Sequence, residues 1–233
     1  MRYQVPIIFI AVLLSACDKT PVGDEMFPLE KGRSWTYQVT TNYQGQAPIE
    51  SELNIKALGS DTIDGQTVWR RYSDTGSEYW LRPDETGIIR VASKHGLDNK
   101  AVVDKPSRYV LKKPFAIDSS WSAPTTAYLL ERYNQKPKRV SETHGFFPME
   151  YRIDAVDIDV ATQAGKFSAC LLVLGRAAIR LYVDAALAWR NVPLTTREWY
   201  CPQVGLVKLE REEPTPSRFM KGGKYTLELI AWE

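Results

Sequence analysis

The clearest sign of fold class is the stretch Trp35-Thr36-Tyr37-Gln38-Val39-Thr40, in which large apolar and polar side chains alternate. A period of two places the apolar side chains on one face of a β-strand and the polar side chains on the other. Leu53, Ile55 and Ala57 repeat the pattern further along the chain. Both stretches therefore predict strands that bury one face.

Turn residues mark where such strands end. Asp64-Gly65 precedes the β-branched and aromatic run 67–72 and is typical of a two-residue hairpin turn. Lys221-Gly222-Gly223-Lys224 is likewise expected to form a hairpin turn before a last strand at 225–232. Short strands separated by such turns favour an antiparallel sheet.

Three stretches are less regular. Residues 94–107 are polar with little periodicity, so we predict a long loop. The apolar alternation changes phase between Ala155 and Val156, which predicts either a β-bulge or a strand that passes between two sheets. After a strand near residues 179–182, the alanine-rich residues 184–188 are expected to form a short helix. Taken together, the patterns predict a mainly β domain with little helix, in which antiparallel twisted sheets form a sandwich or a partial barrel.

The first sixteen residues differ from the rest of the chain. Arg2 is their one charged side chain, and the run from Val5 to Leu14 is apolar. This run is about half as long as the roughly 20 residues that a membrane-spanning helix needs. A basic start, a short apolar run and small residues before a cleavage point are typical of an export signal.

The four residues Leu14-Ser15-Ala16-Cys17 resemble the lipobox of bacterial lipoproteins. This resemblance implies a signal peptide at 1–16, a lipidated Cys17 with a tether at 17–26, and a single β-rich domain at 27–233. Several acyl chains on one residue give stable membrane anchoring. The alternative is an ordinary secretory signal followed by a coincidental cysteine.

The resemblance also implies a compartment, the bacterial cell envelope, with the protein facing the periplasm. Asp18 resembles the retention signal of enteric bacteria and favours the inner membrane over the outer. In an oxidising compartment the remaining pair, Cys170 and Cys201, is expected to form a disulfide. Two buried free thiols are the alternative. His95 and His144 lie far from the cysteines in sequence, so we expect no metal site and no cofactor.

Three further patterns resemble a family of uncharacterised exported β-rich lipoproteins. The resemblance brings no activity with it, and we expect these residues to support the fold. We call them the first, middle and late patterns: Phe27-Pro28-Leu29-x-x-Gly32-x-x-Trp35-x-Tyr37, Ala164-Gly165-x-Phe167-x-x-Cys170-Leu171-x-Val173, and Val204-Gly205-Leu206-Val207-Lys208.

Charge and motifs exclude several functions. Without Arg2 the chain has 30 − 1 = 29 basic and 28 acidic side chains, a balance that argues against nucleic-acid binding. The sequence has no nucleophile elbow, zinc-protease motif or phosphate loop, so we predict that it is not an enzyme. Asp154, Asp157 and Asp159 could bind calcium, but such spacing is also typical of a solvated strand face.

The predicted function is that of a membrane-anchored, non-enzymatic binding or assembly module. Its expected partners are the lipid bilayer and an envelope protein or apolar ligand. The alternative is a carrier of lipid or another apolar ligand, with a curved-sheet cavity lined by Trp69, Tyr72 and Trp80. A third hypothesis is an enzyme with a non-local site, which clustering of His144 with carboxylates in a concave pocket would favour. The basic stretch 132–139 is either solvated or contacts lipid headgroups or peptidoglycan.

Overall fold

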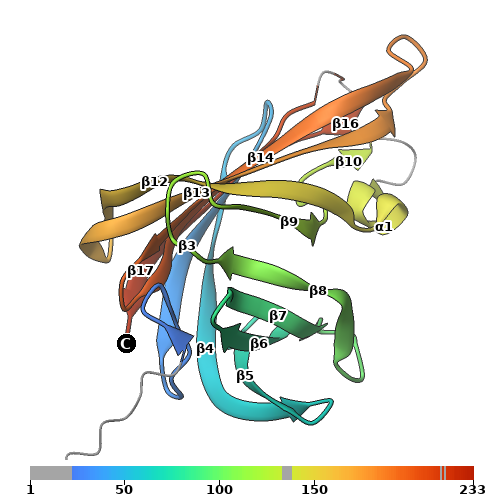
Figure 1. The fold of residues 1–233 in the computed structure, drawn as a ribbon. Helices are drawn as coiled ribbons and strands as arrows, with labels where there is room; N and C mark the ends of the chain where they lie inside the picture. Colours follow the sequence, from blue (N-terminus) through green and yellow to red (C-terminus); the bar gives the residue numbers. More distant parts are fainter. Residues whose placement is uncertain (1–22, 133–137, 216, 218) are drawn as a thin grey trace, which may run out of the picture.

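The computed structural model describes residues 23–132, 138–215, 217 and 219–233. The predicted signal peptide and Cys17 lie outside these residues. Within them the secondary structure is almost entirely β, as the sequence predicts, and most strands belong to one antiparallel sheet (Figure 1).

The first half of the chain forms a six-stranded antiparallel meander, which we call the N-terminal arm. Each of its strands pairs with the next along the chain. The strands are β3 (Ser34–Tyr43), β4 (Ile49–Ile63), β5 (Gln66–Ser73), β6 (Glu78–Asp84), β7 (Gly87–Lys94) and β8 (Val102–Lys112).

The second half forms a similar meander, the C-terminal arm. Its sheet strands pair in chain order, although short elements are inserted between some of them. The strands are β9 (Ser120–Thr125), β12 (Phe147–Thr162), β13 (Gly165–Tyr182), β14 (Trp189–Cys201), β15 (Gly205–Glu213) and β17 (Gly223–Trp232).

Pairing between β3 and β17 joins the two arms into one sheet. The strand order is β8-β7-β6-β5-β4-β3-β17-β15-β14-β13-β12-β9. The sheet curls until its two edge strands, β8 and β9, lie near each other, so it forms a nearly closed barrel. We call the opening between these edges the seam. The predicted antiparallel partial barrel is therefore confirmed.

Short elements pack around the ends of this sheet. A hairpin near the start of the described chain is made by β1 (Gly23–Asp24) and β2 (Phe27–Pro28). A small three-stranded sheet is made by β11 (Lys138–Arg139), β10 (Glu131–Arg132) and β16 (Met220–Lys221). One described helix, α1 (Val140–His144), follows β11.

The side-chain alternation seen in the sequence places the core. Trp35, Tyr37 and Val39 of β3 are buried, and the residues between them are not. The main hydrophobic core combines both arms, with Leu81 from β6 and Met149 from β12 among its members. The predicted bulge is present, because the β12–β13 register shifts several times between Ile153 and Val160.

The paired glycines near the C-terminus play a different role from the predicted one. They do not form a hairpin turn, since β16 pairs with β10 while Gly223 in β17 pairs with Glu213 in β15. A Cβ on Gly222 would lie 2.2 Å from the Glu213 carbonyl oxygen, and one on Gly223 would lie 2.0 Å from that of Asn42. Glycine is required there because neighbouring backbones approach closely.

Two other predictions need correction. The predicted loop at 94–107 is too long, because β8 begins at Val102 and pairs with β7 despite its polar residues. The predicted helix at 184–188 is a turn: the Asp184 carboxylate accepts hydrogen bonds from the backbone N–H groups of Ala186 and Leu187 at 2.9 and 2.8 Å. Local side-chain bonds of this kind compete with helix formation.

Candidate binding site

The first and late patterns meet at the end of the sheet where the β1–β2 hairpin packs, which we call the proximal end. The Trp35 indole Nε1 donates a hydrogen bond to the Val204 carbonyl at 2.8 Å. The Tyr37 hydroxyl donates one to the Leu206 carbonyl, also at 2.8 Å. These bonds satisfy the polar groups of two buried aromatic side chains and hold β3 to the start of β15.

The middle pattern belongs to the same region. The Ala164 backbone N–H donates a hydrogen bond to the Leu229 carbonyl at 3.1 Å. Cys170 and Cys201 form the expected disulfide between β13 and β14, with Cα atoms 4.2 Å apart. Phe167 packs against the hydrophobic cluster that contains both cysteines. The three patterns therefore build one structural region rather than an open site.

A buried arginine completes the proximal end. Arg71 of β5 lies between the rings of Phe27 and Trp35, with its Cζ atom 4.1 and 4.2 Å from the ring centroids. Its Nη2 donates a hydrogen bond to the Pro28 carbonyl at 2.6 Å. Burial lowers the pKa of Arg71 to about 10. Among the described residues no carboxylate forms an ion pair with it.

A second buried arginine lies near the opposite end of β3 and β17, which we call the distal end. Arg211 Nε donates a hydrogen bond to Glu213 at 2.6 Å, and Nη2 donates one to the Thr126 carbonyl at 2.7 Å. Glu213 also accepts backbone N–H bonds from residues 128–130 at 2.8 to 3.2 Å. The ion pair therefore holds the segment that follows β9 against the sheet.

A partly buried carboxyl, that of Glu198 in β14, lies between the two ends of the sheet. The Tyr200 hydroxyl donates a hydrogen bond to Glu198 at 2.6 Å. Burial raises the pKa of Glu198, although Tyr200 and the nearby guanidinium groups of Arg108 and Arg211 oppose the shift. Raised carboxyl pKa values occur in catalytic sites, but also in packed polar cores. The pockets along β8, β9 and β12 are lined by other residues.

An apolar groove lies over the seam. It consists of two adjoining pockets of about 360 and 300 Å³ that share Pro106 of β8, Pro124 of β9 and Phe146. Phe146 immediately precedes β12, and its side chain is 65% exposed. The volumes lie at the small end of the range for ligand sites. We call the two pockets the seam groove; the rest of its apolar lining is Val102, Val103, Ala123, Phe147 and Pro148.

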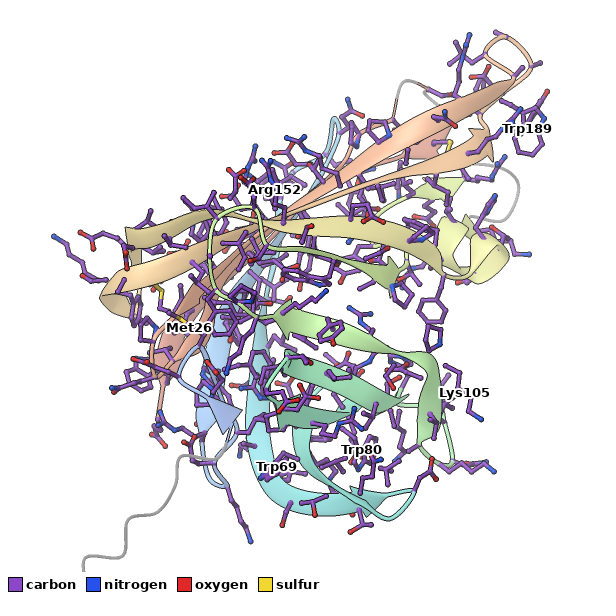
Figure 2. The ribbon with its side chains drawn as sticks, in the orientation of Figure 1. Met26, Trp69, Trp80, Lys105, Arg152 and Trp189 are labelled. Atoms are coloured by element: carbon purple, nitrogen blue, oxygen red, sulfur yellow. A yellow bond between two sulfur atoms is a disulfide. The ribbon has the colours of Figure 1, made fainter. Side chains whose placement is uncertain are left out.

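The walls of the seam groove determine how a partner can bind there. Arg90 donates two hydrogen bonds to Asp104 at 2.6 and 2.9 Å, which fixes the start of β8 against β7. Pro106 and Pro124 have no N–H group, so neither sheet edge can donate a backbone hydrogen bond at those positions. Lys105 lies beside them on β8 (Figure 2). The groove therefore favours contacts with apolar side chains over the addition of a strand.

The residues singled out for catalysis or metal binding do not come together. His144 Nδ1 lies 3.0 Å from the hydroxyl of its neighbour Thr143, and His95 lies in the loop between β7 and β8. Asp154 forms an ion pair with Arg152 at 2.6 Å. Within the described ranges, no group of three His, Cys, Asp or Glu side chains is placed to hold a metal ion.

The aromatic residues proposed to line a ligand cavity do not share one face of the sheet. Trp69 pairs with Leu81, and its neighbour Arg70 pairs with Trp80. Adjacent pairs point to opposite faces, so Trp69 and Trp80 are separated by the sheet. Trp69 packs on the main core, whereas Trp80 belongs to a separate cluster.

Several predictions concern the membrane. The lipidation site Cys17 lies outside the described residues, as does Lys136 of the basic stretch. Arg132, Lys138 and Arg139 of that stretch belong to the small sheet. Among the helices that the structure describes, none is long and apolar enough to cross a membrane.

Little in the sequence points to the seam groove. Two adjacent aromatic residues, Phe146 and Phe147, follow a polar segment, which is a weak signal of exposure. The other walls come from β8 and β9, and these meet only because the whole sheet curls. Periodicity within single strands contains no information about that closure.

Comparisons with known proteins are distant. No protein-family model matches the chain, and no curated protein matches it. A solved structure of a "putative lipoprotein" from Parabacteroides distasonis is 14% identical, with a TM-score of 0.39, over 89% of this chain and 98% of that chain. A "putative exported protein with YmcC-like fold" from Bacteroides fragilis is 11% identical, with a TM-score of 0.37 and the same coverage of 89% and 98%. Similarity at this level identifies no family, so the function has to be inferred from the residues of the chain itself.

Proposed function

We propose that this protein is an envelope lipoprotein that acts as a non-enzymatic binding module, with the seam groove as its binding site. The observation that carries the proposal is the groove itself, where the exposed ring of Phe146 stands beside Pro106 and Pro124 at the opening of the barrel. A large aromatic side chain left exposed in an apolar groove is typical of an interaction site.

The proposed occupant is an apolar segment of another envelope protein. The two pockets are large enough for one or two bulky side chains each, and their lining offers mainly apolar contact. The two prolines remove backbone donors from both edges, so the partner is held by its side chains. Burial of one large apolar side chain contributes about 1.5–3 kcal/mol, which is enough for a transient complex when two are engaged.

Acyl chains on Cys17 would keep the binding module at a membrane surface. The lipobox-like residues 14–17 support this part of the proposal, together with the disulfide between Cys170 and Cys201, which suits an oxidising compartment. The periplasmic face of the inner membrane is the location favoured by Asp18. A membrane-bound partner would then be met in two dimensions, which raises its effective concentration.

The carrier alternative has less support. The interior where a lipid would lie contains buried side chains such as Trp121, Met149 and Ile153, all packed in the main core. The proposed lining residues Trp69 and Trp80 lie on opposite faces of the sheet. A surface groove that receives side chains fits these observations better than an enclosed lipid site.

Site-specific photocrosslinking in cells tests the groove. A photoreactive phenylalanine analogue replaces Phe146 in one variant and Ile49, which is 56% exposed on β4, in a matched control. We expect a discrete protein adduct from position 146 and none of the same mass from position 49. Val102→Arg, at a 57% exposed position in the groove, should weaken the adduct, and Phe146→Ala should weaken binding of the identified partner by about tenfold or more.

Two results would contradict the proposal. Identical adduct patterns from both positions would show that the groove has no partner of its own. If the Cys17→Ser variant is still labelled by radioactive palmitate, Cys17 is not the site of acylation. That result would contradict the proposed anchor and leave the proposed binding site in the groove unaffected. The crosslinking experiment therefore tests the binding site, and the palmitate experiment tests the membrane attachment separately.

A further inference from the structure

The β13–β14 hairpin extends beyond the rest of the sheet at the distal end. Pairing of β13 with β12 stops at Arg176, and pairing of β14 with β15 stops at Thr195. Beyond these positions, residues 177–182 pair with residues 189–194. We call this two-stranded projection the distal ribbon; Figure 1 shows its tip far from the first described residues of the chain.

The two faces of the distal ribbon differ in burial. Ile179, Leu181 and Val192 on the inner face are buried in the main core. On the outer face, the cross-strand pair of Tyr182 and Trp189 remains 41% and 55% exposed. Their rings meet edge to face with centroids 5.9 Å apart, which explains part of their burial and leaves about half of each side chain in solvent.

The outer face is also basic. Arg180 shares it with Tyr182, because alternate residues of a strand point the same way. The Arg180 guanidinium lies 5.8 Å from the Trp189 ring. Residues 177–182 and 189–194 contain no Asp or Glu, and none of the ion pairs found among the described residues involves Arg180. At the base of the ribbon, Arg176 is paired across the strands with Glu150 of β12, which is exposed on the same face.

The nearest acidic residue of the turn is already engaged. Asp184 Oδ1 accepts the two backbone N–H bonds of the turn, and its Oδ2 accepts a hydrogen bond from the Ser217 hydroxyl at 2.7 Å. Its charge is thus directed into the turn. The distal ribbon presents two exposed amphipathic rings with the guanidinium group of Arg180 beside them.

We propose that the outer face of the distal ribbon binds an anionic phospholipid surface. Trp and Tyr rings favour the depth of lipid headgroups, because one end of each ring system is polar and the rest is apolar. Guanidinium groups bind phosphate with two parallel hydrogen bonds, and each basic residue near an anionic surface adds to the attraction. The charge and the aromatic character of this face complement the same surface.

The position of the ribbon indicates which bilayer it meets. Met26 lies in the β1–β2 hairpin region and Trp189 at the ribbon tip, and Figure 2 places them at opposite ends of the molecule. If the proposed anchor holds the N-terminal side on one membrane, the ribbon faces a second, apposed bilayer. This step rests on the proposed anchor, whereas the affinity of the ribbon for anionic lipid does not.

Vesicle capture tests the inference. The acylated protein is reconstituted on phosphatidylcholine vesicles, and fluorescent vesicles containing phosphatidylglycerol are added and followed by flotation. We expect capture of the anionic vesicles, and no capture of fluorescent vesicles of phosphatidylcholine alone. Tyr182→Ala with Trp189→Ala should lower capture by about tenfold or more, and Arg180→Gln by about fivefold at low salt.

The controls distinguish the possible failures. Trp232→Ala removes a 39% exposed aromatic ring at the proximal end and should leave capture unchanged, as should Phe146→Ala in the seam groove. Equal capture of neutral vesicles, or full capture by the Tyr182→Ala, Trp189→Ala protein, would overturn the inference. If the protein fails to join the first vesicles, the anchor proposal fails, and direct flotation with anionic vesicles then tests the ribbon alone.

Discussion

Arg71 at the proximal end and Arg211 at the distal end are both buried, yet they are held in different ways. Arg71 lies between two aromatic rings and donates to one carbonyl. Arg211 has a carboxylate partner in Glu213, which also accepts backbone hydrogen bonds from a neighbouring segment. The pKa values differ accordingly. Burial lowers the pKa of Arg71 to about 10, whereas the lowering effect of burial on Arg211 is outweighed by Tyr128 and Glu213, so that its pKa is raised.

A buried charge therefore serves two different purposes in one sheet. At the proximal end the guanidinium acts mainly as a flat surface that fills space between Phe27 and Trp35. At the distal end the ion pair connects the sheet to the segment at residues 126–130. Loss of a partner should therefore cost more unfolding free energy at the distal end than at the proximal end.

The largest effect is expected for Glu213→Gln. The change leaves the buried charge of Arg211 without its counterion, which typically costs about 3–5 kcal/mol of unfolding free energy. Equilibrium urea unfolding measures the loss. Glu212→Gln is the matched control, because its side chain is 46% exposed and lies 3.8 Å from Arg197; it should cost at most about 0.5 kcal/mol.

A smaller loss of unfolding free energy is expected for Arg71→Met. An unbranched apolar side chain can still pack between Phe27 and Trp35, but the Pro28 carbonyl loses its donor. We expect a cost of about 1–2 kcal/mol, because removal of the buried charge offsets part of the lost hydrogen bond and ring contacts. A cost larger than that of Glu213→Gln, measured in the same urea titration, would reverse the comparison of the two ends.

The smallest and most pH-dependent effect is expected for Glu198→Gln. The pKa of Glu198 is raised from its usual 4.5, mainly by burial, so the folded protein binds this proton more tightly than the unfolded chain does. Its contribution to stability is complete below pH 4.5 and is lost as the pH rises through the folded pKa. The variant lacks this titration, so the stability of the wild type relative to the variant should fall as the pH rises.

Unfolding titrations of both proteins between about pH 4 and pH 8 check this sign. Parallel stability curves would show that Glu198 titrates normally in the folded state. Tyr200 should keep its hydrogen-bond acceptor in the variant, because an amide oxygen can replace the carboxylate oxygen. The change therefore isolates charge from packing.

The strands and the proximal end could be predicted from the sequence because their signals are local. Alternation around Trp35 and Tyr37 places them in the core, and the phase change after Ala155 marks the bulge region. The Cys170–Cys201 pairing followed from cysteine number and the expected compartment. In each case a few neighbouring residues contain the whole signal.

The seam groove and the distal ribbon could not be predicted in this way. Pro106, Pro124 and Phe146 are brought together by the curl of the complete sheet. Gly222 and Gly223 resemble a turn in sequence. In the structure, glycine is required at these positions because the backbones of Glu213 and Asn42 lie too close for a side chain. Trp189 follows a segment that the sequence suggests is helical, so its outward position on a ribbon becomes evident only from the β13–β14 register.

The pairing of β3 with β17 has a consequence for how the chain is made. Within each arm most paired residues are near neighbours in sequence. In the β3–β17 ladder, by contrast, paired residues such as Tyr43 and Gly223 are separated by most of the chain. Closing so large a loop carries a high entropic cost, so each meander can form before the arms join. During synthesis or threading through a translocon from the N-terminus, one edge of β3 stays unpaired until β17 is available. A chaperone that shields this edge would protect the chain from aggregation.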